Sequence, residues 1–117
     1  MKIEELQIGN WVFDTNNDIE CQVDIKDFRN GGEYILDYYE PIPLTAEILE
    51  KNGWRYEDFS KYYADDDLYY VCNEIVIHIN KDKFEIRCTE SVDIELKYVH
   101  ELQNILKLMK IEKEIKL

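Results

Sequence analysis

The chain has 117 residues, of which 45% are apolar, so it is long enough for one hydrophobic core and too short for two. It carries 26 acidic and 14 basic residues, and the resulting formal net charge of −12 repels phosphate backbones. We therefore expect no direct binding of DNA or RNA. We expect instead an attraction to a partner protein with a basic surface.

Three short strands are expected in the first third of the chain. Residues 11–13 form the first, the turn-forming residues 14–18 end it, and apolar residues at alternate positions within 19–25 predict the second strand of a hairpin. After a glycine-rich turn, the tyrosine-rich residues 34–39 predict a third strand. The three strands make a small curled sheet. An SH3-like partial barrel is one arrangement open to it, because periodicity does not decide whether such a sheet closes.

Two prolines divide the chain after this sheet. Pro41 and Pro43 rule out a central strand here, since proline donates no ladder hydrogen bond. They separate subregions 1–43 and 44–117 of a single domain. Thr45 then predicts the N-cap of a short helix, and Gly53 suits the left-handed position just beyond the helix end.

The second subregion predicts a sheet and a covering helix. Four antiparallel strands are expected, over residues 68–72, 75–79, 84–88 and 92–96. An amphipathic helix over residues 98–109 follows, because its apolar residues recur at steps of three and four. Those residues are Val99, Leu102, Ile105, Leu106 and Met109. Packed on the four strands, this helix completes a two-layer α+β domain.

The cellular setting follows from absences in the sequence. The first residues show no apolar run behind a basic start, and no stretch approaches the roughly 18 apolar residues of a membrane span. We therefore expect a cytoplasmic protein with no signal peptide and no membrane partner. Cys21, Cys72 and Cys88 are odd in number and widely spaced, which favours reduced, buried thiols over a disulfide.

A search for catalytic or metal-binding patterns finds none that is specific. His78 lies on an apolar strand and could pair with Cys72 or Cys88 as a nucleophile, but a solvent-facing strand histidine is the commoner case. The acidic residues 65–67 lack the glycine and glutamate spacing of an EF-hand, which favours a solvated loop. No phosphate-binding glycine loop, GxSxG or CxxC occurs. We expect no enzyme activity, no metal and no cofactor.

One candidate binding group lies on the last predicted helix. His100, Gln103 and Asn104 are three and four residues apart, so their side chains share a polar strip beside the apolar one. An imidazole and two amides could form directional hydrogen bonds to a ligand or a partner. Alternatively, Gln103 and Asn104 tie the helix to a neighbouring strand or loop, which is the more common role for such residues.

A second candidate group interleaves aromatic and cationic residues. Trp54, Arg55 and Tyr56 are followed closely by Lys61. Together they could stack the base of a small nucleotide and bind its phosphate, because stacking contributes roughly 1 to 3 kcal/mol per base. The alternative is that Trp54 and Tyr56 belong to the core, where the chain leaves the short helix.

Three segments resemble a family of small uncharacterised proteins encoded by phages and prophages of Bacteroidetes. Residues 8–12 read IGNWV, residues 40–45 read EPIPLT and residues 98–104 read YVHELQN. Family members are similar along nearly their whole length, with the three segments in the same order and at comparable spacing. The resemblance implies a mobile-element origin and a setting in the cytoplasm of an infected bacterium. It implies no reaction.

These observations lead to three functional hypotheses. In the leading one, a small acidic phage-type protein antagonises or modulates a host process, such as an antiviral defence, by binding a partner protein. In the second, the chain sequesters a small nucleotide signal, with pockets between the chains of a homo-oligomer. In the third, it is a structural or accessory phage protein with no ligand. Binding through acidic charge should weaken steeply with salt, whereas a closed nucleotide pocket should depend on salt less.

Overall fold

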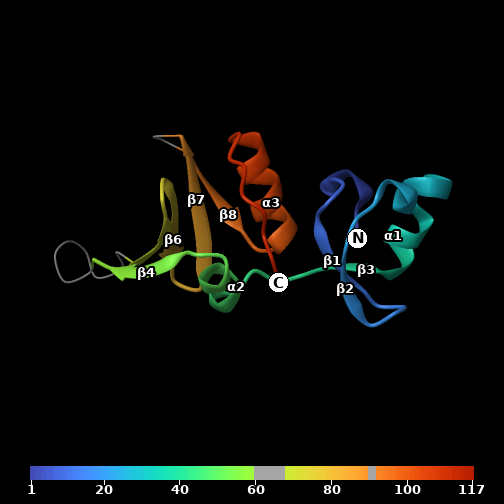
Figure 1. Cartoon of the computed structure of the whole chain (residues 1–117), viewed down its shortest axis with the longest axis horizontal. Coiled ribbons are helices and arrows are strands. Elements are labelled where there is room, and N and C mark those ends of the chain that lie inside the picture. Colours follow the sequence, from blue (N-terminus) through green and yellow to red (C-terminus); the bar gives the residue numbers. More distant parts are fainter. Residues whose placement is uncertain (60–67, 90–91) are drawn as a thin grey trace. The chain divides into compact units, whose positions relative to one another are not determined.

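The computed structural model describes residues 1–59, 68–89 and 92–117, which form an α+β fold with two antiparallel sheets (Figure 1). The predicted α+β class is confirmed. Contacts divide the chain into two compact units: the first comprises residues 1–43 and 98–112, and the second comprises residues 44–97 and 113–117. In the described ranges, no helix combines the length and apolar character needed to cross a membrane.

The first unit is built around a three-stranded sheet. Its elements are η1 (Ile3–Glu5), β1 (Trp11–Asp14), β2 (Ile19–Gln22), η2 (Ile25–Gly32), α1 (Glu33–Tyr38), β3 (Tyr39–Pro41) and α3 (Val99–Leu108). The strand order is β2-β1-β3, and β1 pairs antiparallel with both neighbours. The predicted hairpin is confirmed. Because β2 and β3 occupy opposite edges, this sheet is open and does not form a closed barrel.

The predicted third strand is wrong over most of its length, because residues 33–38 form the helix α1. Gly31 and Gly32 have φ angles of 70° and 74°, which turn the chain sharply before the helix. A Cβ atom at Gly32 would lie 2.5 Å from Cδ1 of Ile3, so the turn also packs closely on η1. In α1, Tyr34 and Tyr38 are four residues apart and their ring centroids lie 4.8 Å from each other.

The proline-containing segment forms an edge strand of the first sheet, as expected for residues that cannot donate a ladder hydrogen bond. β3 ends at Pro41, which pairs with Val12 of the central strand. Pro43 then forms an isolated antiparallel bridge with Tyr98. The break between residues 43 and 44 separates the two units at this point in the chain.

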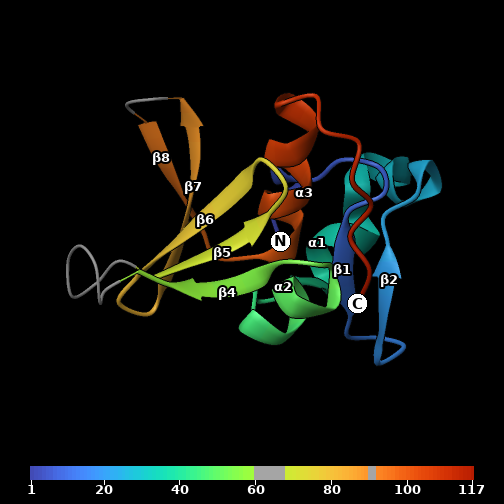
Figure 2. The ribbon, with the colours of Figure 1, turned by 60° about the vertical axis from the view of Figure 1, so that its left-hand side comes forward.

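The second unit contains a short helix and a five-stranded sheet. Its elements are α2 (Ala46–Lys51), β4 (Arg55–Asp58), β5 (Leu68–Cys72), β6 (Ile75–Asn80), β7 (Lys83–Thr89) and β8 (Val92–Leu96). The strands follow the order β4-β5-β6-β7-β8, as Figure 2 shows. The four predicted strands are confirmed. The fifth, β4, escaped prediction because only one of its four residues is apolar.

The predicted central helix is confirmed together with its ends. The Thr45 hydroxyl oxygen accepts a hydrogen bond from the Ile48 N–H at 3.3 Å, which satisfies one of the free donors at the helix start. Gly53 has a φ of 94°, the left-handed conformation expected just beyond the last turn. The chain then passes into the buried Trp54 and β4.

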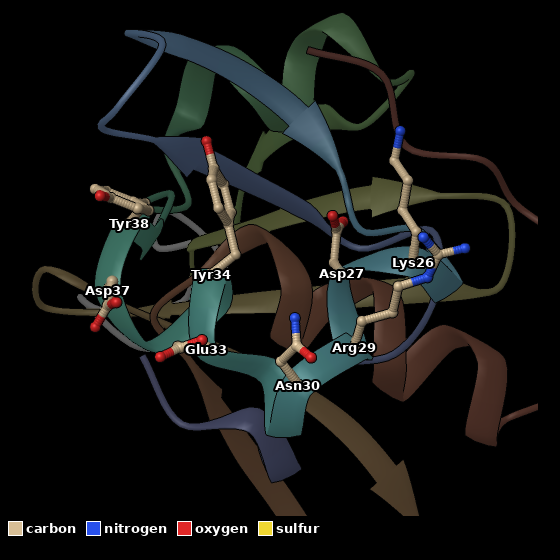
Figure 3. A pocket seen from close by; sticks show the side chains of 8 residues that line it. All are labelled: Lys26, Asp27, Arg29, Asn30, Glu33, Tyr34, Asp37 and Tyr38. Atoms are coloured by element: carbon tan, nitrogen blue, oxygen red, sulfur yellow. The ribbon is translucent and has the colours of Figure 1, made fainter.

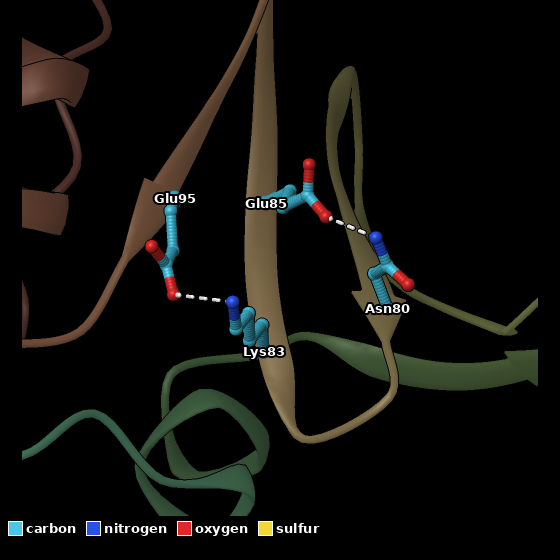
Figure 4. A network of polar contacts seen from close by, with 4 residues as sticks. All are labelled: Asn80, Lys83, Glu85 and Glu95. Carbon is cyan, nitrogen blue, oxygen red and sulfur yellow. Dashed lines mark hydrogen bonds and ion pairs between the residues drawn. The ribbon is translucent and has the colours of Figure 1, made fainter.

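Like charges face each other on the polar side of the second sheet. Glu85 of β7 pairs directly with Glu95 of β8, an arrangement that is unfavourable by itself. Each carboxylate has a compensating partner: Asn80 donates to Glu85 at 2.8 Å, and the Lys83 ammonium lies 4.0 Å from Glu95 (Figure 4). Because the lysine is exposed, we expect this ion pair to contribute little to stability.

The last helix is confirmed, but its expected position is corrected. Its predicted stripe is buried at Val99, Leu102, Ile105 and Leu106, whereas Met109 is the C-cap residue and is half-buried. The helix was expected to pack on the second-subregion sheet, whereas its contacts group it with the first unit, where it meets β1. This grouping depends on hydrogen bonds across more than 90 residues, which helical periodicity cannot indicate.

After α3, the end of the chain docks within the second unit. The side-chain amide of Asn52 donates to the Lys116 carbonyl at 2.7 Å and accepts from the Lys116 N–H at 2.7 Å. The Lys113 ammonium lies 5.0 Å from the centroid of the Trp54 ring, and Ile115 is buried. Residues 113–117 are therefore an extended, anchored segment.

Candidate functional site

Gln103, one of the three residues in the predicted strip, is engaged inside the first unit. Its side-chain oxygen accepts a hydrogen bond from the Trp11 N–H at 2.8 Å. Its amide nitrogen donates to the Gly9 carbonyl at 3.1 Å. The side chain thus holds the helix to the start of β1, and both ends of the amide are occupied.

Asn104 has a similar role one residue further along α3. Its oxygen accepts from the Asn10 side chain at 2.8 Å, and its nitrogen donates to the Glu5 carbonyl at 3.1 Å. Asn10 is only 3% exposed, and its own oxygen accepts from the Gln7 N–H at 2.8 Å. The structure therefore shows Gln103 and Asn104 tying the helix to neighbouring segments.

Residues of three segments singled out in the sequence, 8–12, 40–43 and 98–104, meet in the first unit. The first and the last are joined by the amides of Asn10, Gln103 and Asn104. The Val99 N–H donates to the Ile42 carbonyl of the central segment at 2.9 Å. These contacts give all three segments a part in the packing of the first unit.

His100 differs from Gln103 and Asn104 because its side chain is buried. It is 2% exposed, and its ring lies parallel to that of Tyr98, with centroids 5.8 Å apart. Its Nδ1 has no hydrogen-bond partner among the described residues. Burial lowers the pKa of His100, although the charges of Glu101 and Glu5 oppose the effect. The imidazole is therefore neutral at pH 7 and is not presented to a partner.

The described members of the second predicted group differ in burial. Trp54 is 2% exposed, so its ring faces are covered within the second unit. Arg55 is exposed, and Tyr56 points to the opposite face of β4, where its ring centroid lies 5.6 Å from that of Tyr70. Lys61 lies outside the described residues.

Two adjoining cavities open on the first unit, and sequence reasoning singled out neither. The helix cavity has a volume of about 410 Å³ and is lined by Lys26, Asp27, Arg29, Asn30, Glu33, Tyr34, Asp37 and Tyr38. Figure 3 shows the two cations on one side, with Asp37 and Tyr38 on the other. The strand cavity, of about 420 Å³, is lined by Asp14, Asn17, Ile19, Cys21, Gln22, Asp24, Lys26, Asp27, Tyr34 and Tyr39. Both volumes fall in the range of about 300 to 1,000 Å³ that is typical of ligand pockets.

Asp14 supplies a fixed negative charge to the strand cavity. Its carboxylate accepts hydrogen bonds from the Asn16 N–H at 3.0 Å, the Asn17 side chain at 2.8 Å and the Tyr34 hydroxyl at 2.9 Å. Burial alone would raise the pKa of Asp14, but these donors outweigh it and the pKa lies below its usual value. The group is therefore ionised at neutral pH.

Two further carboxylates at this cavity are held by a turn. At the start of η2 the Asp27 carboxylate accepts from the Asp24 N–H at 2.9 Å, and the Asp27 N–H donates to the Asp24 carbonyl at 3.0 Å. The buried Tyr39 hydrogen-bonds to Asp27 and Cys21, and burial is the main cause of its raised pKa. Burial likewise raises the pKa of Cys21, so this thiol is not an activated nucleophile.

The composition of residues 1–43 could have indicated this site. This segment holds ten acidic residues against three basic ones, a stronger imbalance than in the rest of the chain. The lining residues come from β1, β2, η2, α1 and β3, so their proximity depends on the fold. Carboxylates beside tyrosine rings are suited to bind ammonium or guanidinium groups.

Other site chemistries lack support in the described ranges. No group of three or more His, Cys, Asp or Glu side chains there could hold a metal ion. Cys21 and Cys72 are free thiols. No family model, curated protein or solved structure matches the chain.

Proposed function

We propose that this chain is a small acidic binding protein that engages a basic surface on a partner protein. In doing so it antagonises or modulates a host process, and the phage resemblance points to antiviral defence. The observation that carries the proposal is the presence of two adjoining cavities whose rims bear the carboxylates of Asp24, Asp27, Glu33 and Asp37. Many host proteins that hold nucleic acid expose such a basic surface, and an acidic protein can compete for it.

The charge and ring chemistry of the cavities support a cationic partner group. Lys and Arg side chains gain from nearby carboxylates and from the faces of aromatic rings such as Tyr34 and Tyr38. The remaining negative charge of the chain adds long-range attraction, which speeds encounter and falls with ionic strength.

A charge-reduction experiment tests this proposal. In the double variant Asp24→Asn and Asp27→Asn, two negative charges are removed, while the side chain at position 27 keeps an oxygen that can accept from the N–H of residue 24. The matched control, Asp82→Asn with Glu114→Gln, removes two exposed charges from the second unit. Immobilised proteins are incubated with bacterial lysate at about 0.05 M and about 0.5 M salt, with and without duplex DNA as a competitor.

Support would be a basic host protein that is retained at low salt, displaced by DNA, and lost with the first-unit variant but kept by the control. Equal retention by both variants would show that only net charge matters and would overturn a role for the cavities. If nothing is retained at either salt concentration, the proposal fails and the accessory role with no ligand becomes the better description.

Sequestration of a nucleotide is a second candidate, because the helix cavity brings cations and aromatic rings together. Lys26 and Arg29 lie across from Tyr38, with Tyr34 between them (Figure 3). Native mass spectrometry of protein purified from bacteria reports oligomeric state and any retained small molecule. A nucleotide-sized adduct that is lost in Arg29→Ala, but kept in Arg55→Ala, would favour this candidate over protein binding.

A further inference from the structure

The outer edge of β2 has the geometry to accept another strand. In the described sheet, β2 pairs only with β1, and it contains no proline. The opposite edge, β3, contains Pro41 and so lacks one donor. The Val23 N–H donates inward to the Asn10 carbonyl at 2.8 Å, and alternation therefore directs the N–H groups of Glu20 and Gln22 outward.

The strand cavity covers one face of this sheet, from Tyr39 of β3 across Asp14 of β1 to β2 at the edge. Ile19, Cys21 and Gln22 of β2 contribute to its lining, next to the carboxylates of Asp24 and Asp27. A strand added beside β2 would therefore place alternate side chains next to the acidic cavity. Ile19, which is 57% exposed, offers an apolar contact at the start of the same strand.

The charges around β2 decide which kind of strand fits. Asp18 precedes the strand, Glu20 lies within it and Asp24 follows it, whereas the strand itself has no basic residue. A second copy of this chain would bring like charges into direct opposition, which disfavours edge-to-edge pairing. A segment rich in Lys or Arg would instead meet the opposite charges of Asp18, Glu20 and Asp24.

We propose that β2 accepts an extended basic segment of the partner protein as an added strand, with a Lys or Arg side chain in the strand cavity. This inference rests on the proposed binding of a basic partner and specifies its recognised form. Backbone hydrogen bonds to the open edge provide affinity, and the carboxylates of Asp14, Asp24 and Asp27 provide selectivity for a cation.

Synthetic peptides test the backbone contribution. The probe is a peptide of about ten residues that alternates arginine with threonine, since threonine favours strands. Two further peptides have the same sequence but carry N-methyl groups on alternate residues, one on the odd positions and the other on the even positions. Methylation removes backbone donors and keeps every charge. We expect the methylated peptides to bind at least about tenfold more weakly in isothermal titration, with chemical-shift changes of the unmethylated peptide centred on residues 19–22.

A variant of the protein tests the same edge from the other side. Glu20→Pro removes one outward N–H, and the matched control Glu20→Gln removes the charge and keeps the donor. We expect the proline variant to lose binding beyond the loss in the glutamine variant. Its fold is checked by circular dichroism, and the methylated peptides provide the decisive result if it is unfolded.

The outcomes separate this inference from the proposed function. Equal affinity for methylated and unmethylated peptides would overturn strand addition but leave charge-based binding of a basic partner intact. Strand addition would also be overturned, and charge-based binding kept, if the arginine peptide does not bind but a basic host protein is retained. If neither the peptide nor a basic host protein binds, both proposals fail.

Discussion

At the scale of single residues, amide side chains connect the most distant parts of the first unit. Asn104 and Asn10 are 94 positions apart, yet their side chains share a hydrogen bond of 2.8 Å. Gln103 reaches Gly9 and Trp11 in the same way. Such bonds are directional, so they determine how the helix is placed along β1.

We predict that Asn104→Ala lowers the free energy of unfolding by about 1 to 3 kcal/mol, because the buried amide of Asn10 loses its acceptor. Urea denaturation followed by circular dichroism measures the change. Lys107→Ala, an exposed position on the same helix, is the control and should leave the midpoint nearly unchanged. Equal midpoints for Asn104→Ala and the wild type would show that the amide pair is dispensable.

His100 makes stability depend on pH. Burial lowers its pKa in the folded protein, so the unfolded chain binds a proton more readily near the ordinary value of about 6.5. The stabilisation that the buried, neutral imidazole contributes is therefore fully present above about pH 6.5. It is lost as the pH falls towards the lower pKa of His100 in the folded protein. We predict a lower urea midpoint at about pH 5.5 than at about pH 7.5, and a histidine NMR titration below the ordinary range.

The pH prediction has a variant and a matched control. His100→Leu should flatten the dependence of the midpoint on pH in this window, whatever its overall stability. His78→Gln removes the other histidine, which lies on β6, and should preserve the dependence. A slope that disappears with His78 and persists without His100 would contradict the assignment.

At the scale of elements, the sequence predicted the helices that have recognisable cap residues or a regular apolar stripe. Thr45 and Gly53 bound α2 at the expected positions, and the stripe of α3 is buried as its periodicity indicates. The helix α1 was predicted as a strand because its tyrosines and isoleucine favour strands, while Gly31 and Gly32 turn the chain into a helix. In this case tertiary packing outweighs intrinsic preference.

Two leucines of α3 provide an internal comparison. Leu102 is fully buried, whereas Leu108 is 77% exposed. We predict that Leu102→Ala lowers the free energy of unfolding by about 2 to 5 kcal/mol, through lost burial and a residual cavity. Leu108→Ala, with the same change in helix propensity, should cost less than about 0.5 kcal/mol. Similar costs for the two variants in urea denaturation would show that this face of α3 is not the buried one.

At the scale of the whole molecule, the excess of acidic residues is shared by both units. The first unit holds twelve acidic and five basic residues, and the second holds fourteen and nine. Repulsion between like charges opposes the compact state, and salt screens it. The ion pairs Lys83–Glu95 and Arg87–Asp93 are exposed and lose little when salt is added.

We therefore predict that added sodium chloride stabilises the protein. The urea midpoint should rise between about 0.05 M and about 0.5 M salt at neutral pH. Potassium chloride at the same concentrations is the control for ion-specific effects, and should produce the same rise. A midpoint that falls with both salts would show that ion pairing contributes more to stability than repulsion costs.

The candidate site was the least predictable feature of this molecule. Asp14, Asp24 and Asp27 look like ordinary turn residues in the sequence, and the signal at residues 1–43 is only a local excess of acids. The hydrogen bonds of Asp14 to Tyr34 and of Asp27 to Tyr39 arise because α1 and β3 fold back against the hairpin. Conversely, Trp54 stood out in the sequence as a binding candidate and is part of the second unit's core, whereas its neighbour Tyr56 is half exposed.

The sequence by itself determined the α+β class, the first hairpin, the central helix, four strands of the second sheet and the stripe of the last helix. Each of these depends on local periodicity, caps or turns within about twenty residues. Only the tertiary structure decided that α3 belongs with β1, that β4 extends the second sheet, and that acidic residues from separate elements line two cavities. Those features depend on contacts between residues far apart in the chain, which no local pattern encodes.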